Sequence, residues 1–122
     1  MSRQLEQKLQ ERFALYLQAR GILFCASAGG MRTSIGTAVK MKRAGYKKGF
    51  PDIFIYEPKG RFHGIAFELK VENHSKNEAQ DEWIAELNKR GYYAVKVPGK
   101  LGLMEAEKFL INELDKYMWG AL

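Results

Sequence analysis

Apolar residues recur at helical spacing in three long segments of the chain. The first segment ends at Arg20-Gly21, which supply a basic last turn and a glycine stop, and its apolar positions are Leu5, Leu9, Phe13, Tyr16 and Leu17. The second covers residues 77–90, with Asn77 as N-cap, and the third covers about residues 103–118. A shorter basic helix, closed by Gly45, is expected over residues 34–44.

Short apolar runs rich in strand formers lie between these helices. Residues 22–26 indicate a short buried strand, residues 52–57 and 64–71 flank a turn and predict a hairpin, and residues 92–97 predict a fourth strand. The element order predicts an α/β fold in which a mixed four-stranded sheet is flanked by helices. With 122 residues and no linker or repeat, residues 1–122 fit a single domain.

Two polar side chains interrupt the apolar helix faces. At about 100° per residue, Glu6 falls inside the apolar stripe of the first helix, whereas Glu11 falls on the solvent side. A carboxylate facing the protein needs a cation or hydrogen-bond donors, although a glutamate near a helix start is also favoured by the helix dipole. Gln80 points inward from the helix at residues 77–90 by the same geometry.

The predicted hairpin carries a second group of polar side chains. The period of two places Glu68 and Lys70 on one strand face, while Asp52 leads the preceding strand after Pro51, which cannot donate a ladder hydrogen bond. If the register aligns these faces, two carboxylates and one ammonium converge; otherwise the strand has a solvated face whose ion pair contributes little. Clustered carboxylates bind Mg²⁺, and a lysine beside them assists attack on a phosphodiester. The set is typical of a nuclease.

The charge distribution indicates a polyanionic partner. The net charge is +6, yet no acidic residue occurs between Arg12 and Pro51, where eight cations give +8 and leave −2 for the remainder. We expect DNA contacts in this region from Arg32, Lys40, Lys42, Arg43, Lys47 and Lys48. The alternative is that these cations only solvate a loop and a helix.

Composition excludes several other classes of protein. Hydrophobic residues make up 46% and charged residues 28%, as in globular domains, and no apolar run approaches the roughly 20 residues of a membrane span. The polar N-terminus and the lone Cys25 predict an intracellular, reducing location, with Cys25 expected as a buried core thiol. There is no P-loop, and we expect neither a membrane partner nor a small-molecule cofactor.

One pattern matches a known family. Pro51-Asp52, fifteen residues and then Glu68-Leu69-Lys70 form the PD-(D/E)XK signature of restriction-endonuclease-like nucleases. With Gly49-Phe50, the Gln80-Asp-Glu-Trp83 segment, Glu6 and the Gly29-Gly30 turn, residues 5–97 resemble the VRR-Nuc (virus-type replication and repair nuclease) branch. The resemblance implies a restriction-endonuclease-like core around a metal site.

The resemblance also implies a role for each site residue. Asp52, Glu68 and the backbone carbonyl of Leu69 would ligate Mg²⁺ or Mn²⁺, and Glu6 would bind through water or a second metal. Lys70 would orient or activate the attacking water. Gln80 would hold the lysine or a phosphate contact in place.

Stand-alone members of this branch, largely from phages, look like homodimeric endonucleases that cut branched DNA such as Holliday junctions. The resemblance thus implies a phage-type enzyme acting in the cytoplasm of a bacterial host. Residues 31–44 or the C-terminal helix could supply the dimer interface, although we expect Trp119 in the monomer core or in a loop. A nuclease for nicks, flaps or restriction-type sites remains an alternative, as does a non-catalytic DNA-binding module.

Overall fold

The computed structural model describes residues 2–27 and 34–120 of the chain. Helices and strands follow one another in the order predicted from the sequence. Their bounds are α1 (Ser2–Ala19), β1 (Phe24–Ala26), α2 (Ile35–Arg43), β2 (Ile53–Ile55), β3 (Ile65–Glu68), α3 (Glu78–Lys89), β4 (Tyr93–Lys96) and α4 (Leu103–Trp119). The predicted α/β arrangement is confirmed, with shorter strands than the apolar runs suggested.

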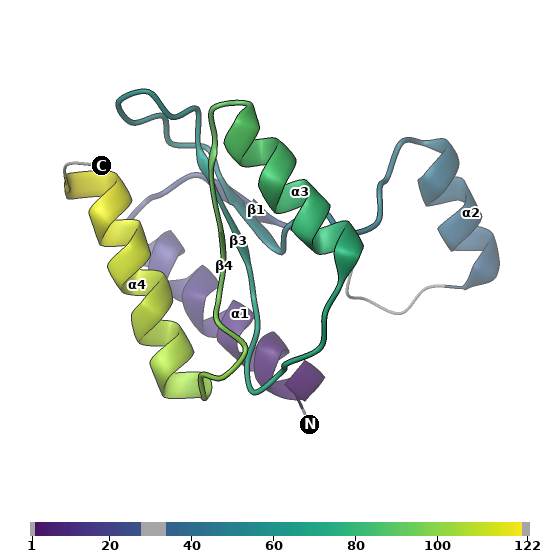
Figure 1. The fold of residues 1–122 in the computed structure, drawn as a ribbon, viewed down its shortest axis with the longest axis horizontal. Coiled ribbons are helices and arrows are strands. Elements are labelled where there is room, and N and C mark those ends of the chain that lie inside the picture. Colours follow the sequence, from purple (N-terminus) through teal and green to yellow (C-terminus); the bar gives the residue numbers. More distant parts are fainter. Residues whose placement is uncertain (1, 28–33, 121–122) are drawn as a thin grey trace.

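The four strands form one mixed sheet in the order β1-β2-β3-β4. β2 runs antiparallel to both neighbours, and its hairpin with β3 pairs Phe54 with Ala66. β3 and β4 are parallel because α3 carries the chain back along the sheet between them (Figure 1). The buried clusters place α1 and α4 on one face of the sheet and α3 on the other.

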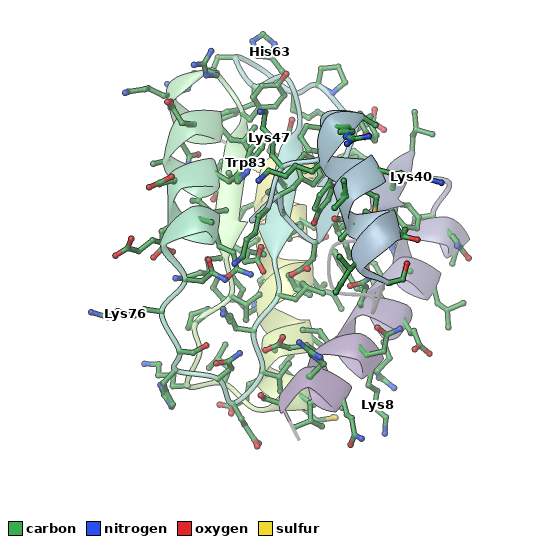
Figure 2. All side chains as sticks on the ribbon, turned by 90° about the vertical axis from the view of Figure 1, so that its right-hand side faces the viewer. Lys8, Lys40, Lys47, His63, Lys76 and Trp83 are labelled. Carbon is green, nitrogen blue, oxygen red and sulfur yellow. The ribbon has the colours of Figure 1, made fainter. Side chains whose placement is uncertain are left out.

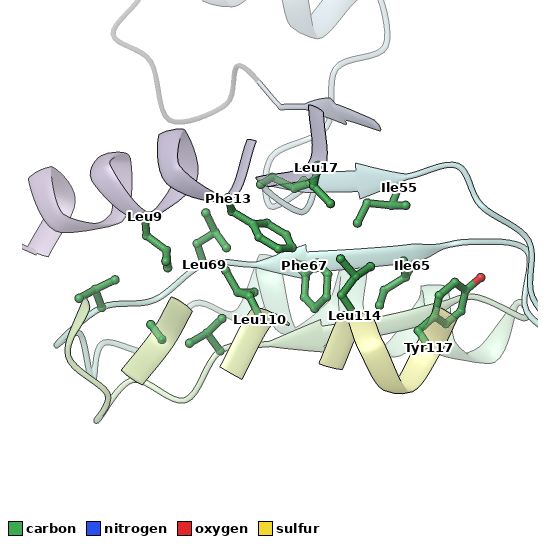
Figure 3. Close-up of a cluster of buried hydrophobic side chains, with 14 residues drawn as sticks. Leu9, Phe13, Leu17, Ile55, Ile65, Phe67, Leu69, Leu110, Leu114 and Tyr117 are labelled. Carbon is green, nitrogen blue, oxygen red and sulfur yellow. The ribbon is translucent and has the colours of Figure 1, made fainter. Parts of the chain in front are cut away.

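The larger core lies between the sheet and the helices α1 and α4, as Figure 3 shows. The helices contribute Leu9, Phe13, Leu17, Leu110, Leu114 and Tyr117. Phe13 packs edge-on against Phe67 of β3, with 5.5 Å between the ring centroids. Each fully buried apolar side chain contributes about 1.5 to 3 kcal/mol. This packing fixes α1 against β3 and so places the first turns of α1 near the end of that strand.

The opposite face of the sheet carries a smaller cluster in which Leu87 of α3 packs with Phe54, Ala66 and Ala94. α2 differs from the other helices because none of its residues is buried. Ser34 caps it by accepting a hydrogen bond from the Thr37 N–H. Figure 1 shows α2 standing away from the sheet and its other helices.

Two sequence predictions about the core are wrong. The first strand is not buried, because β1 lies at the edge of the sheet and leaves the Cys25 side chain exposed. Trp119 lies in neither the core nor a loop: it is the last residue of α4 and is 78% exposed, because two residues of helix turn its side chain about 200° away from the buried Tyr117, whose hydroxyl donates to the Glu57 carbonyl. Within the described ranges, no helix is both long and apolar enough to cross a membrane.

Candidate active site

Two carboxylates meet where β2 begins and β3 ends. The hairpin register pairs Ile53 with Phe67, so its continuation by one residue sets Asp52 opposite Glu68. Glu68 is only 2% exposed and Lys70 only 5%, which rules out the alternative of a solvated strand face. Both acids line the same cavity. The convergence of faces expected from the sequence is therefore present.

The environment of Glu68 strongly disfavours its charged form. Burial, followed by the hydrogen bond and the charge of Asp52, raises the pKa of Glu68 to about 10, while the charge of Lys70 acts in the opposite direction. Its Oε1 atom is buried and has no hydrogen-bond partner among the described residues. A buried acid with an unused oxygen beside a second acid is an arrangement that a cation would relieve.

Pro51 and Asp52 together shape the backbone at Leu69. The Leu69 N–H donates to Oδ2 of Asp52 at 2.7 Å, so the Leu69 carbonyl also points toward the β2 side. Continuing the hairpin register places Pro51 opposite Leu69, and proline has no N–H to donate to that carbonyl. Pro51 therefore cannot supply the hydrogen bond that a residue opposite Leu69 would ordinarily donate.

Glu6 reaches the same cavity from α1. Its Oε2 accepts hydrogen bonds from the Val71 N–H at 3.4 Å and from Nδ2 of Asn73 at 3.0 Å. Glu6 lies beyond the first turn of α1, so these donors, rather than the helix start, explain its position. Asn73 was not singled out from the sequence, because no periodicity marks a loop residue that orients a carboxylate.

Gln80 is placed by the capped start of α3. Asn77 is the N-cap, as predicted, and its Oδ1 accepts a hydrogen bond from the Gln80 N–H at 3.2 Å. The Gln80 side chain lines the cavity with the carboxylates, and its Oε1 is buried without a partner in the described part of the chain. A buried amide oxygen requires a donor, which a lysine, a water or a ligand can supply.

The cavity has a volume of about 340 Å³ and extends beyond the predicted residues. Its wall along α1 also includes Arg3 and Gln10, which lie three residues before and four after Glu6 on one helix face, and Gln7, which lies four residues after Arg3. That spacing could have revealed them in the sequence. Tyr46 also lines the cavity, and its position in a loop gave no comparable signal.

The predicted basic residues occupy one region of the molecule. Lys40, Lys42 and Arg43 are exposed on α2, while Lys47 and Lys48 are exposed in the loop that leads to β2. Figure 2 shows Lys40 and Lys47 on the same side of the molecule as Trp83. Lys48 lines the cavity with the carboxylates. Arg32 and the Gly29-Gly30 turn lie outside the described residues.

The donor set suits a hard divalent cation. Such a cation takes oxygen ligands, and Mg²⁺ in particular keeps several waters and uses one or two carboxylates. Asp52 and Glu68 line one cavity with their carboxylates, and the backbone of Leu69, whose N–H donates to Asp52, lies beside them. Within residues 2–27 and 34–120, no three His, Cys, Asp or Glu side chains are grouped closely enough to hold a metal ion. Glu6 is therefore not close enough to Asp52 and Glu68 to form a three-carboxylate metal site with them.

The sheet order, the helices on both faces and the carboxylates at the strand ends define a restriction-endonuclease-like domain. The VRR-NUC domain family matches residues 2–100. A solved structure described as a VRR_NUC domain protein is 34% identical, with a TM-score of 0.58 over 69% of this chain and 64% of its own. No curated protein matches. The chain belongs to the VRR-NUC domain family, a nuclease-type domain, which confirms the resemblance noted in its sequence.

Proposed function

We propose that this protein is a metal-dependent endodeoxyribonuclease that cuts branched DNA, with the Holliday junction as its preferred substrate. The observation that carries the proposal is the pairing of the buried Glu68, which has an unpaired carboxyl oxygen, with the half-buried Asp52 in the wall of one cavity. An acid pair of this kind destabilises a protein unless it serves a ligand. The acid-free basic segment beside it supplies the complementary charge for a phosphate backbone.

Each residue of the site has a separate proposed role. Asp52, Glu68 and the Leu69 carbonyl would hold Mg²⁺ or Mn²⁺, which would supply positive charge against the charge that develops on the phosphate and would acidify water. Lys70 would orient or activate the attacking water, and it is buried close enough to Glu68 for its charge to lower the pKa of that carboxyl. Gln80 uses its unpaired amide oxygen to hold the lysine or a water that contacts phosphate. Glu6 binds through water from the α1 wall.

A homodimer is the proposed active form. α2 has no buried residue, and its Ile35 and Val39 side chains are 85% and 45% exposed, so this helix offers an unpartnered apolar surface. A second copy docking there would present two sites related by a two-fold axis. That symmetry matches the paired strands of a four-way junction, which one small domain cannot span alone.

The first experiment compares DNA structures in Mg²⁺. Purified protein is incubated with a Holliday junction, a flap, a fork, a nicked duplex and a linear duplex of matched sequence. We expect the junction to be cut fastest. Equal cutting of the linear duplex would remove the branched-DNA claim and favour a restriction-type nuclease, and faster cutting of nicks or flaps would reassign the substrate.

Variants of the site test the assignment of residues. Asp52→Asn and Lys70→Met are each expected to reduce cleavage by at least about 100-fold, because each removes a group that acts in the transition state. Circular dichroism and thermal unfolding control for the fold, and junction binding in EDTA controls for DNA affinity. Cleavage at the wild-type rate by either variant would contradict the assignment. A protein that binds in EDTA and never cuts would be a DNA-binding module.

A further inference from the structure

A second cavity adjoins the first and has different chemistry. It measures about 420 Å³, within the range typical of ligand pockets, and is lined by Ser27, Gly45, Tyr46, Lys47, Phe50 and Trp83. Three of these residues are aromatic and one is a cation. Ser27, Tyr46 and Phe50 also line the cavity that holds the carboxylates, so the two hollows share a wall.

Two of the three rings are fixed by their neighbours. Trp83 donates from Nε1 to the Lys48 carbonyl at 3.1 Å, which ties α3 to the loop before β2. Phe50 packs edge-on against Trp83 at 5.2 Å between centroids and lies nearly parallel to Phe54 at 6.5 Å. These contacts hold the apolar wall in place before any ligand arrives, which lowers the cost of binding.

The third ring has an open position. Tyr46 is held through its backbone, whose N–H donates to the Met41 carbonyl, and it is partly exposed. Its ring packs against no other aromatic ring of the described residues. It therefore offers a ring face to a planar ligand, with the exposed Lys47 close by to meet a negative charge.

We propose that this aromatic cavity binds an unpaired nucleobase of the DNA strand whose phosphodiester lies at the carboxylate pair. The inference rests on the proposed function and adds a base-binding subsite to it. Planar π surfaces beside a lysine suit a nucleotide, because the base stacks on the rings and the phosphate meets the cation. Phe50 precedes Asp52 by only two residues, so the subsite lies close to the reacting phosphate.

A subsite of this kind also favours branched over linear DNA. Extracting a base from an intact duplex costs unstacking and unpairing energy, whereas a branch point or bulge has already lost part of it. The cavity accepts any base, because stacking on aromatic rings depends weakly on base identity. Structure selectivity without sequence selectivity is the result that this subsite would produce.

A double-mutant cycle tests the stacking contact. The substrates are junctions that carry one unpaired thymidine or, at the same place, an abasic residue. In a series of such junctions the place of this residue is shifted stepwise past the branch point, and the binding of the protein to each junction is measured in EDTA. At one position we expect Tyr46→Ala to weaken binding of the thymidine junction about five- to hundred-fold and to leave the abasic junction unaffected. Tyr46→Phe should bind like the wild type. Tyr56→Ala, which removes a 48% exposed ring outside both cavities, is the matched control.

Photocrosslinking locates the base directly. 5-Iododeoxyuridine at that position is expected to crosslink to the peptide that carries Tyr46 and Phe50 or to the one that carries Trp83. Equal losses for both junctions at every position, or crosslinks confined to other peptides, would overturn the proposal. The proposal would also be overturned if Tyr46→Ala sediments as a monomer where the wild type sediments as a dimer and shows no base-dependent effect. That result would assign the cavity to contact with a second copy.

Cleavage assays on the same junctions separate this proposal from the proposed function. Base-dependent coupling at Tyr46 without any cleavage in Mg²⁺ would leave the subsite standing and remove the nuclease. Cleavage without the coupling would leave the nuclease standing and remove the subsite. The two failures are therefore distinguishable with one set of DNA substrates.

Discussion

At the scale of single residues, the pair formed by the half-buried Asp52 and the buried Glu68 dominates the chemistry of the molecule. Without a cation, the raised pKa of about 10 keeps Glu68 protonated at neutral pH. The unfolded chain releases that proton near pH 4.5, the ordinary value for a glutamate. Between these two values the folded state binds more protons than the unfolded state, so stability falls as pH rises. A bound cation would remove this dependence by favouring the carboxylate.

Glu68→Gln tests this linkage. In EDTA we expect the variant to raise the melting temperature at pH 8 by on the order of 5 °C, the shift that about 1 kcal/mol produces in a small domain, and by much less at pH 5. Thermal unfolding followed by circular dichroism measures both values. Glu82→Gln, which alters an exposed glutamate of α3, should change neither. A gain that is equal at both pH values would contradict the raised pKa.

Residue patterns found the candidate site because polar side chains on apolar faces are costly. Glu6 and Gln80 interrupted apolar helix faces, whereas Glu68 and Lys70 followed the period of two onto one strand face. Glu6, Gln80 and Glu68 line one cavity, and Lys70 is buried close to Glu68. Asn73 and Tyr46 broke no period, because both lie in loops whose side-chain directions depend on tertiary packing. The sequence therefore identifies polar residues on apolar faces more clearly than it identifies the loop residues that contact them.

At the scale of elements, the loop between α2 and β2 is held against α3 by a close backbone contact. Gly49 has a φ of +91°, and a Cβ built there would lie 2.6 Å from the Ala79 carbonyl carbon. Only glycine allows both the left-handed conformation and this approach. The contact fixes the start of β2, including Asp52, relative to the first turn of α3, which carries Gln80.

Gly49→Ala and Gly45→Ala separate these two effects. Gly45 also has a positive φ, of +103°, but an added Cβ there meets nothing within 4 Å. We expect both variants to lose about 1 to 2 kcal/mol from backbone strain, and Gly49→Ala to lose roughly 1 to 3 kcal/mol more from the overlap with Ala79. Urea unfolding measures the difference, and cleavage should fall mainly in Gly49→Ala. Equal losses of stability would show that the close contact is unimportant.

The sequence predicted whether a segment is a helix or a strand more easily than it predicted which neighbours that element packs against. Caps such as Ser34 and Asn77 are local signals, and both mark the helix starts that the structure has. The run at residues 22–26 predicted a strand correctly but not its place at the sheet edge, because an apolar run does not specify its neighbours. The same limit explains Trp119, whose burial depends on where the sheet ends beneath α4.

At the scale of the whole molecule, the positive charge is concentrated on one side of the active-site cavity. Exposed cations occupy α2 and the following loop, and α2 itself stands away from the sheet (Figures 1 and 2). Of the +8 carried by residues 12–51, α2 and the loop after it hold +5, from Lys40, Lys42, Arg43, Lys47 and Lys48, so the field steers a polyanion toward the site. The same helix carries the exposed apolar residues proposed for the dimer, so DNA and a second copy would meet on neighbouring surfaces.

Charge reversal distinguishes phosphate contacts from general attraction. Lys47→Glu/Lys48→Glu and the control Lys89→Glu/Lys108→Glu each lower the net charge from +6 to +2, since two reversals remove four charges. Lys89 and Lys108 are exposed and line neither active-site cavity. Long-range attraction depends on net charge, so both double variants should lose it equally. A phosphate contact releases a counterion only where a lysine touches the DNA backbone, so only the variant that removes such contacts should change counterion release.

The slope of log affinity against log salt concentration measures those contacts. Each lost contact flattens the slope by about 0.9, so the Lys47/Lys48 variant should be flatter than the wild type by about 1.8, while the control keeps the wild-type slope. Junction binding in EDTA between 50 and 200 mM salt covers the range in which such contacts matter most. If both variants keep the wild-type slope, Lys47 and Lys48 contribute solubility alone, and the DNA path must follow α1, where Arg3 lines the cavity.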